Sequence, residues 1–216
     1  MKQLEIILAE KLLKMGAVKV QLDTPFVWAV GWNAPIYNDD RQMLSLPAVR
    51  NFVKVELART IMENLPQAEM VVGVATGAIA MGALVADVLD LPYAYVRETP
   101  KDHGLENLIE GNIKPGQRVV IVEDLLSTAQ TCMRAVHAVR DAGGEVIAVV
   151  AIMNYEFPMG AKALKREKLP LFALTNYTAM IKAAVETGHI QQRDVATLQR
   201  WHDDPENWTP ADLLVD

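Results

Sequence analysis

The strongest constraint on the fold is a series of apolar runs that alternate with helical segments. The runs Met70–Ala75, Val119–Val122 and Val146–Met153 carry no charge and are rich in valine and isoleucine. This composition is typical of strands that are buried on both faces. A strand with one solvent-exposed face would instead alternate apolar and polar residues. Segments with the length and spacing of helices separate the runs. The alternation predicts an α/β fold, with a central parallel sheet and helices on both faces.

The N-terminal part does not follow this alternation. Its short apolar runs, Val18–Leu22 and Phe26–Val30, indicate a hairpin, and Thr175 is placed to cap a helix that begins near Tyr177. We expect a single domain over residues 1–216. It would comprise a hood with flanking helices (about 1–65), a sheet core (about 66–175) and C-terminal helices (about 176–216).

Composition narrows the class of protein. The hydrophobic share of 51% predicts a packed core, and the net charge of −6 argues against a nucleic-acid partner. Cys132 is the single cysteine, so no disulfide can form within the chain, which fits a reducing compartment and a cytoplasmic location. The uncharged stretch from 70 to 86 has no basic flanks, and we expect a strand, a turn and a helix there instead of a membrane span.

The stretch VVIVEDLLSTAQT, from Val119 to Thr131, carries the main chemical signal. An apolar strand runs into two acids, Glu123 and Asp124, and a loop of small hydroxyl residues leads into a helix. Free N–H groups at a helix start bind phosphate, and paired carboxylates bind sugar hydroxyls. A phosphorylated sugar has both parts. The alternative is an ordinary strand with surface acids, followed by a capped helix.

Two further loops follow strands, where parallel sheets bind their ligands. The turn Ala75-Thr76-Gly77-Ala78 has small residues that would let backbone amides approach a ligand, although close helix packing explains them equally. The polar stretch 97–111 holds cationic or potentially cationic side chains that could neutralise a pyrophosphate, and otherwise it is a solvated loop. These side chains are Arg97, Lys101 and His103.

These motifs resemble those of the type I phosphoribosyltransferases, and more closely those of the orotate phosphoribosyltransferases. The acid doublet and its loop resemble the signature for phosphoribosyl pyrophosphate (PRPP). Residues 32–47, 73–97 and 95–111 resemble the substrate segment, the pyrophosphate region and the catalytic loop of that family. The resemblance spans roughly residues 18–160. It implies a type I phosphoribosyltransferase fold with an N-terminal hood.

The resemblance also implies an activity and a set of site residues. The expected reaction transfers the phosphoribosyl group of PRPP to orotate, giving orotidine 5′-monophosphate and pyrophosphate in pyrimidine biosynthesis. The catalytic residues implied are Lys101, His103, Glu123 and Asp124. PRPP would contact these four together with Ala75, Thr76, Gly77, Arg97, Leu125, Leu126, Ser127, Thr128, Ala129, Gln130 and Thr131. Orotate would contact Ile36, Tyr37, Ser127 and Tyr155.

A cofactor and a partner are implied as well. A polyanionic donor implies Mg²⁺, held mainly by PRPP and by no direct protein ligand. The family's mobile loop reaches the neighbouring subunit, so the resemblance implies a homodimer in which Lys101 and His103 serve the partner's site. No membrane partner is expected.

Some residues depart from the family pattern. Ala129 and Gln130 stand where the phosphate loop usually has glycine, and alanine at positive φ would cost about 1 kcal/mol. Glu98 stands where many members have a lysine. These departures keep two alternatives open: a protein of the same fold that senses PRPP or a nucleotide without turnover, and a phosphoribosyltransferase for another base.

Overall fold

The computed structural model describes residues 3–99 and 108–210. By their internal contacts the residues form two compact units. The sheet unit comprises residues 44–174, and the terminal unit comprises residues 1–43 and 175–216. The expectation of a single domain stays a prediction.

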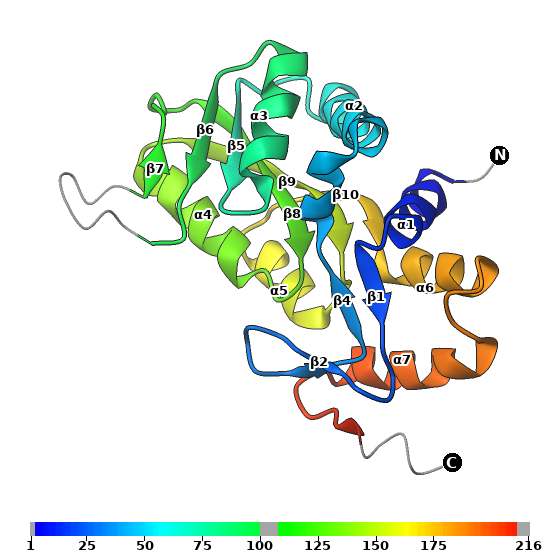
Figure 1. The fold of residues 1–216 in the computed structure, drawn as a ribbon. Coiled ribbons are helices and arrows are strands. Elements are labelled where there is room, and N and C mark those ends of the chain that lie inside the picture. Colours follow the sequence, from blue (N-terminus) through cyan, green and yellow to red (C-terminus); the bar gives the residue numbers. More distant parts are fainter. Residues whose placement is uncertain (1–2, 100–107, 211–216) are drawn as a thin grey trace. The chain divides into compact units, whose positions relative to one another are not determined.

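The sheet unit is built on a six-stranded sheet in the order β10-β9-β8-β5-β6-β7 (Figure 1). The pairs β5–β6, β5–β8 and β8–β9 are parallel, whereas the short β7 runs antiparallel to β6. This confirms the mostly parallel sheet that the apolar runs predict. The strands are β5 (Met70–Val74), β6 (Tyr93–Val96), β7 (Ile109–Glu110), β8 (Arg118–Leu126), β9 (Glu145–Asn154) and β10 (Leu171–Asn176), of which the last crosses into the terminal unit at Thr175.

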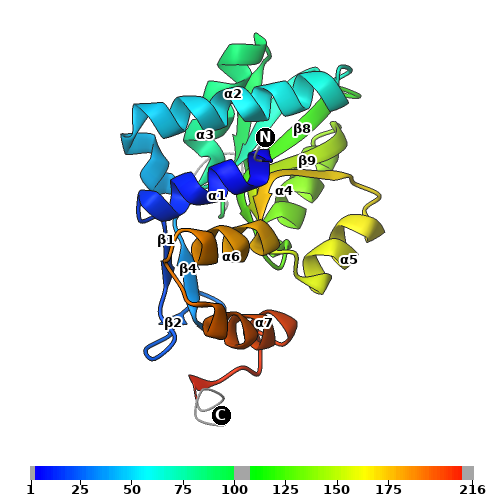
Figure 2. The same cartoon turned by 90° about the vertical axis from the view of Figure 1, so that its right-hand side faces the viewer.

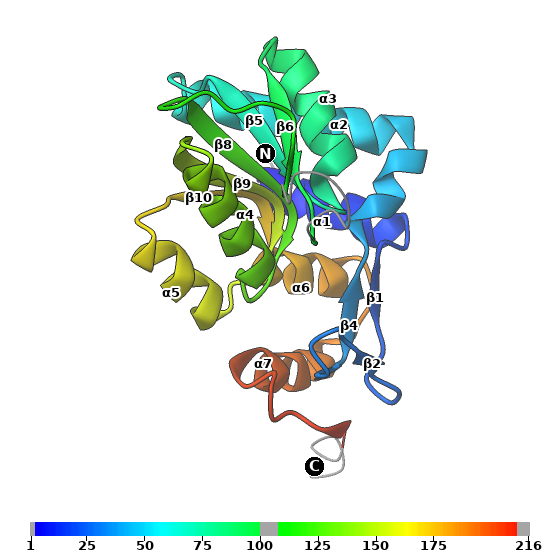
Figure 3. The same ribbon diagram turned by 90° about the vertical axis from the view of Figure 1, so that its left-hand side faces the viewer.

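Helices cover both faces of this sheet. The helices of the sheet unit are α2 (Pro47–Asn64), α3 (Ala78–Leu89), α4 (Gln130–Asp141) and α5 (Pro158–Arg166). The connections β5–α3–β6 and β8–α4–β9 run outward in opposite directions, so right-handed crossovers place α3 and α4 on opposite faces (Figure 3). Successive residues of β5 face these two helices in turn. Val72 belongs to the core beneath α4, whereas Gly73 lies against Ala78 of α3.

The terminal unit differs from the hairpin expected near its start. Its strands are β1 (Val18–Val20), β2 (Phe26–Val27), β3 (Asn33–Ala34) and β4 (Ile36–Asn38), and the pairs are β1–β4 and β2–β3. The expected pairing of the first two runs was therefore wrong. The tight turn lies later, where the Trp28 N–H donates to the Trp32 carbonyl at 2.9 Å. Local pattern located β1 and the start of β2, but it predicted neither β3 and β4 nor the pairing.

The helices of the terminal unit come from both the N-terminal and the C-terminal part of the chain, and they pack together. They are α1 (Leu4–Lys14), α6 (Tyr177–Glu186) and α7 (Val195–Asp203), with 3₁₀ turns η1 (Asp40–Ser45, which runs into the sheet unit) and η2 (Gln192–Asp194). Helices α1 and α6 lie side by side (Figure 2). The Trp201 indole donates to the Asn33 carbonyl at 3.0 Å. The expected cap Thr175 instead donates to the Glu5 carbonyl, and Asn176 caps α6 by accepting from the Ala179 N–H.

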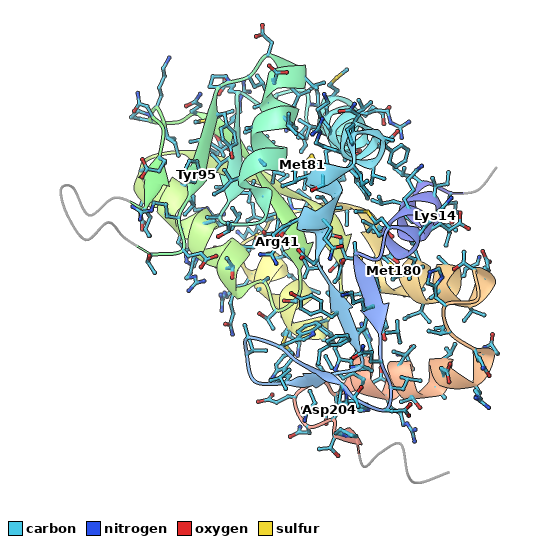
Figure 4. All side chains as sticks on the ribbon, viewed as in Figure 1. Lys14, Arg41, Met81, Tyr95, Met180 and Asp204 are labelled. Carbon is cyan, nitrogen blue, oxygen red and sulfur yellow. The ribbon has the colours of Figure 1, made fainter. Side chains whose placement is uncertain are left out.

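Each unit has its own core. Met81 of α3 and Met180 of α6, both labelled in Figure 4, are almost fully buried in their respective units. The uncharged stretch 70–86 forms strand, turn and helix as expected. Over residues 3–99 and 108–210, no helix combines the length and the apolar character that crossing a bilayer requires.

Candidate active site

Two loops and the acid doublet meet at the carboxyl edge of the sheet. In the parallel register Val74 of β5 pairs with Val96 of β6, and Gly73 pairs with Val122 of β8. The residues that follow these pairs therefore emerge side by side. The sheet brings together the small-residue turn (75–78), the start of the polar stretch at Arg97, and the acid doublet.

The acid doublet lies inside β8 and not after its end. Pairing with β9 continues through Glu123–Ala151 and Leu125–Met153, so the strand extends to Leu126. Successive side chains of a strand point to opposite faces. Glu123 therefore faces the α4 side of the sheet and Asp124 faces the α3 side. The strand was expected to stop at the acids because they interrupt its apolar run, but β9 supplies backbone partners beyond them.

Glu123 is buried, with 5% of its surface exposed, and it lines a small cavity with Cys132. Burial raises the pKa of the Glu123 carboxyl well above its usual value, and the neighbouring Asp124 charge raises it further. Burial and the nearby Glu123 likewise raise the pKa of the Cys132 thiol. Cys132 is therefore a buried thiol with little tendency to ionise, which makes it a poor nucleophile.

Asp124 is half-buried and lies over the small-residue turn. Its Oδ1 accepts a hydrogen bond from the Leu125 N–H at 2.9 Å. Its carboxylate lies directly against Gly77, where a Cβ would overlap Oδ2. The absence of a side chain at Gly77 thus leaves the space that the Asp124 carboxylate occupies. The two acids have different environments, one enclosed and one open to the edge of the sheet.

The loop after β8, here called the hydroxyl loop (127–131), lines the same cavity of about 40 Å³ as Glu123. The loop leads directly into α4, whose first N–H groups have no partners within the helix. Ser127, Thr128 and Thr131 line this cavity, and the Gln130 N–H at the start of α4 donates to the Thr128 hydroxyl at 3.5 Å. Helix N–H groups and hydroxyls in one small hollow suit a phosphate. Leu126 contributes backbone only, since its side chain is in the core and its carbonyl accepts from the Tyr155 N–H at 2.8 Å.

The backbone conformation of the hydroxyl loop depends on Ala129 within it and on Gly160 packed against it. Ala129 precedes α4 with φ of 65°, the left-handed conformation that alanine adopts only at a cost. Gly160, in the first turn of α5, lies against the loop from behind, and a Cβ there would come within 2.6 Å of the Ser127 carbonyl oxygen. Strain at Ala129 is predicted from the sequence. The contact of Gly160 with the loop is not, because only its place early in a helix beginning with Pro158 could have suggested it.

The small-residue turn is tied to the neighbouring strand end. The Ala75 N–H donates to the Val96 carbonyl at 2.8 Å, and the Thr76 hydroxyl donates to Glu98 Oε1 at 3.0 Å. Arg97 lies at the base of the polar stretch, where its guanidinium is 3.7 Å from the Glu110 carboxylate. Glu98 therefore points toward this turn, a contact that the sequence did not reveal.

The remaining predicted residues fall into three groups. Lys101 and His103 lie outside the described residues. Ile36 and Tyr37 are on β4 of the terminal unit, where Ile36 is buried and Tyr37 is 37% exposed. Tyr155 is fully buried and stacks on Phe157, so its ring is enclosed in this structure. The orotate contacts predicted for these residues and Ser127 stay predictions.

A larger cavity has none of these residues in its lining. It has a volume of about 420 Å³ and lies along α6 and α7 of the terminal unit, with Tyr177, Lys182 and His202 among its lining residues. Size alone does not identify a site, and the lining of this cavity holds no pair of neighbouring acids. We therefore place the candidate site at the sheet edge.

The acids do not form a ready-made metal centre. In the part of the chain that the structure describes, no group of three or more His, Cys, Asp or Glu side chains is placed to hold a metal ion. A cation at this edge would need ligand atoms from a bound molecule as well as carboxylate oxygens.

Known proteins share both the sequence and the fold. The phosphoribosyl transferase domain family matches residues 53–191. An orotate phosphoribosyltransferase of Bacteroides thetaiotaomicron is 54% identical, covering 96% of this chain and 98% of its own. The solved orotate phosphoribosyltransferase of Aeropyrum pernix has a TM-score of 0.70 at 25% identity, covering 84% of this chain and 99% of its own.

A further solved structure, the UMP synthase of Leishmania donovani, has a TM-score of 0.76 at 26% identity. The match covers 91% of this chain and 42% of that longer one. The acid doublet, the hydroxyl loop and the sheet order are thus set in a chain whose similarity to its relatives extends over nearly its whole length. The chain belongs to the orotate phosphoribosyltransferase family.

Proposed function

We propose that this protein transfers the 5-phosphoribosyl group of PRPP to N1 of orotate, releasing pyrophosphate and forming orotidine 5′-monophosphate. The observation that carries the proposal is the continuous stretch from Glu123 to Thr131, in which two acids of β8 are followed by the hydroxyl loop at the start of α4. One end of this stretch suits a ribose and the other its 5′-phosphate. Family membership supports orotate as the base and pyrophosphate as the leaving group.

The two acids would play unequal roles at the ribose. As the bond to pyrophosphate breaks, positive charge develops on the sugar ring, and a fixed carboxylate nearby stabilises it. Asp124, open to the sheet edge, is the residue placed to supply this charge. Glu123, whose pKa is raised by burial and by Asp124, would contact a ribose hydroxyl from its enclosed position.

The leaving group would lie between the small-residue turn and the polar stretch. Arg97, Lys101 and His103 would neutralise pyrophosphate, and His103 would give it a proton. Exclusion of water by this stretch would prevent hydrolysis of the activated sugar. Orotate would contact Ser127 and residues of the 36–37 and 155 segments.

We also propose Mg²⁺ as cofactor, a homodimer in which Lys101 and His103 act in the partner's site, and a cytoplasmic location. Asp124 and Glu98 present the hard oxygen donors that Mg²⁺ prefers, although too few to hold it without oxygens from PRPP. The ion would neutralise charge on the departing pyrophosphate.

The test is a pyrophosphate-release assay with purified protein, PRPP, magnesium and orotate. We expect pyrophosphate and orotidine monophosphate in equal amounts, and no release when orotate is replaced by adenine or hypoxanthine. The D124N variant serves as the matched control and should lose most activity while it stays folded. Release with a purine and none with orotate would assign the chain to another base. PRPP binding without turnover on any base would indicate a sensor.

A further inference from the structure

The Glu98 carboxylate lies at the turn where the proposed function places pyrophosphate. Val74 and Val96 are paired neighbours, so Thr76 and Glu98, each two residues further along, emerge together at the sheet edge. The Thr76 hydroxyl donates to Glu98 Oε1 at 3.0 Å, and both side chains are exposed. A pyrophosphate that takes the Thr76 hydroxyl as donor must therefore displace Glu98.

The same turn has a second carboxylate on its other side. Asp124 of β8 lies against Gly77, the residue that follows Thr76. The turn is thus flanked by negative charge from both neighbouring strands. Among the described residues at this edge, the cation nearest in sequence is Arg97, and its guanidinium is shared with Glu110 at 3.7 Å.

The two carboxylates at the turn favour metal-bound pyrophosphate over metal-free pyrophosphate. A metal-free pyrophosphate carries several negative charges, and a carboxylate in contact with its subsite repels it. A divalent cation reverses the sign, because the cation is attracted by the carboxylate and the phosphate oxygens at once. Asp124 cannot be tested alone for this effect, since it is also the proposed ribose ligand. Apart from its proposed oxygen donation to Mg²⁺, which belongs to the same effect, Glu98 has no other proposed role.

We propose that Glu98 is a specificity-determining residue, which makes the small-residue turn select pyrophosphate that carries a divalent cation over metal-free pyrophosphate. The inference rests on the proposed function for the position of the pyrophosphate subsite. Beyond that function, the inference assigns to Glu98 the strength with which pyrophosphate binding depends on the metal ion.

The experiment is calorimetric titration of the full chain with inorganic pyrophosphate, once with magnesium and once with a chelator. The measured quantity is the ratio of the two affinities. The variants are E98Q, which removes the charge at constant shape, and E98D, which keeps the charge. The control E63Q makes the same change in net charge on an exposed residue of α2, away from the sheet edge.

We expect E98Q to bind metal-free pyrophosphate up to about fivefold more tightly and to lower the ratio by the same factor, since fivefold is the upper end of the range for one exposed charge. E98D and E63Q should keep the wild-type ratio. An unchanged ratio in E98Q, or an equal decrease in E63Q, overturns the inference. If wild-type protein releases no pyrophosphate from PRPP with orotate, the proposed function fails. If it does release pyrophosphate and E98Q keeps the ratio, only the role of Glu98 fails.

Discussion

Ala129 is the residue where strain in the site is clearest. Its left-handed φ of 65° is costly for a residue with a Cβ and free for glycine. The A129G variant should therefore be more stable by about 0.5–1 kcal/mol, since the relief exceeds the extra chain entropy of glycine. Chemical denaturation measures the free energy of unfolding. The control A161G, in α5 with ordinary helical geometry, should be destabilised by about 1 kcal/mol. A loss of stability in A129G would contradict the expectation.

Glu123 makes stability depend on pH in a predictable direction. Its folded pKa is raised above the usual 4.5 by burial and by Asp124. The folded state therefore keeps a proton over a pH range in which the unfolded state has lost it, and rising pH through that range favours unfolding. We expect the unfolding free energy of wild type, minus that of E123Q, to decrease as pH rises above about 4.5.

Denaturation of both proteins at a series of pH values measures this difference. The D124N background provides the control, because removal of the Asp124 charge should weaken the decrease without abolishing the larger effect of burial. A difference that stays constant with pH would show that Glu123 titrates at its ordinary value.

The residue scale also shows what the sequence could not reveal. The acids and hydroxyls of the site were predictable, because their chemistry is explicit in the stretch Val119–Thr131. The roles of Gly77, Glu98 and Gly160 were not. Each depends on which distant backbone or side chain it meets, and the parallel register that brings them together is a property of the whole sheet.

At the scale of elements, helix α5 supports the hydroxyl loop through Gly160. Alanine at this position favours the helix, but its Cβ would come within 2.6 Å of the Ser127 carbonyl oxygen. Backbone cannot yield as a flexible side chain can, so the loop must move. We expect G160A to raise the KM for PRPP about tenfold or more, since small displacements of a binding group are costly.

Steady-state kinetics and calorimetry with orotidine monophosphate would check this expectation. K162A, an exposed change two residues along the same helix, should leave both measurements unchanged. If G160A binds the nucleotide as wild type does, α5 does not position the loop.

Elements were predictable where composition alone determines them. The buried strands β5, β8 and β9 were located from their apolar runs, because burial on both faces leaves few sequence choices. The ends of strands and their pairing partners were harder to predict from the sequence. β8 continues past its apolar run because β9 pairs with it, and β1 pairs with β4 across nearly twenty residues.

At the scale of the whole molecule, the proposed homodimer predicts complementation between two inactive variants. K101A lacks the loop lysine, and D124N lacks the ribose carboxylate. If Lys101 acts in the partner's site, a mixed dimer contains one site in which both residues are intact. Random reassortment of an equal mixture makes half of the dimers mixed, so about a quarter of wild-type activity should return. Each variant alone should stay inactive, and light scattering should show the same dimer mass for both. Activity that stays absent in a mixture proven to exchange subunits would mean that each chain uses its own Lys101, and that the active site is complete within one subunit.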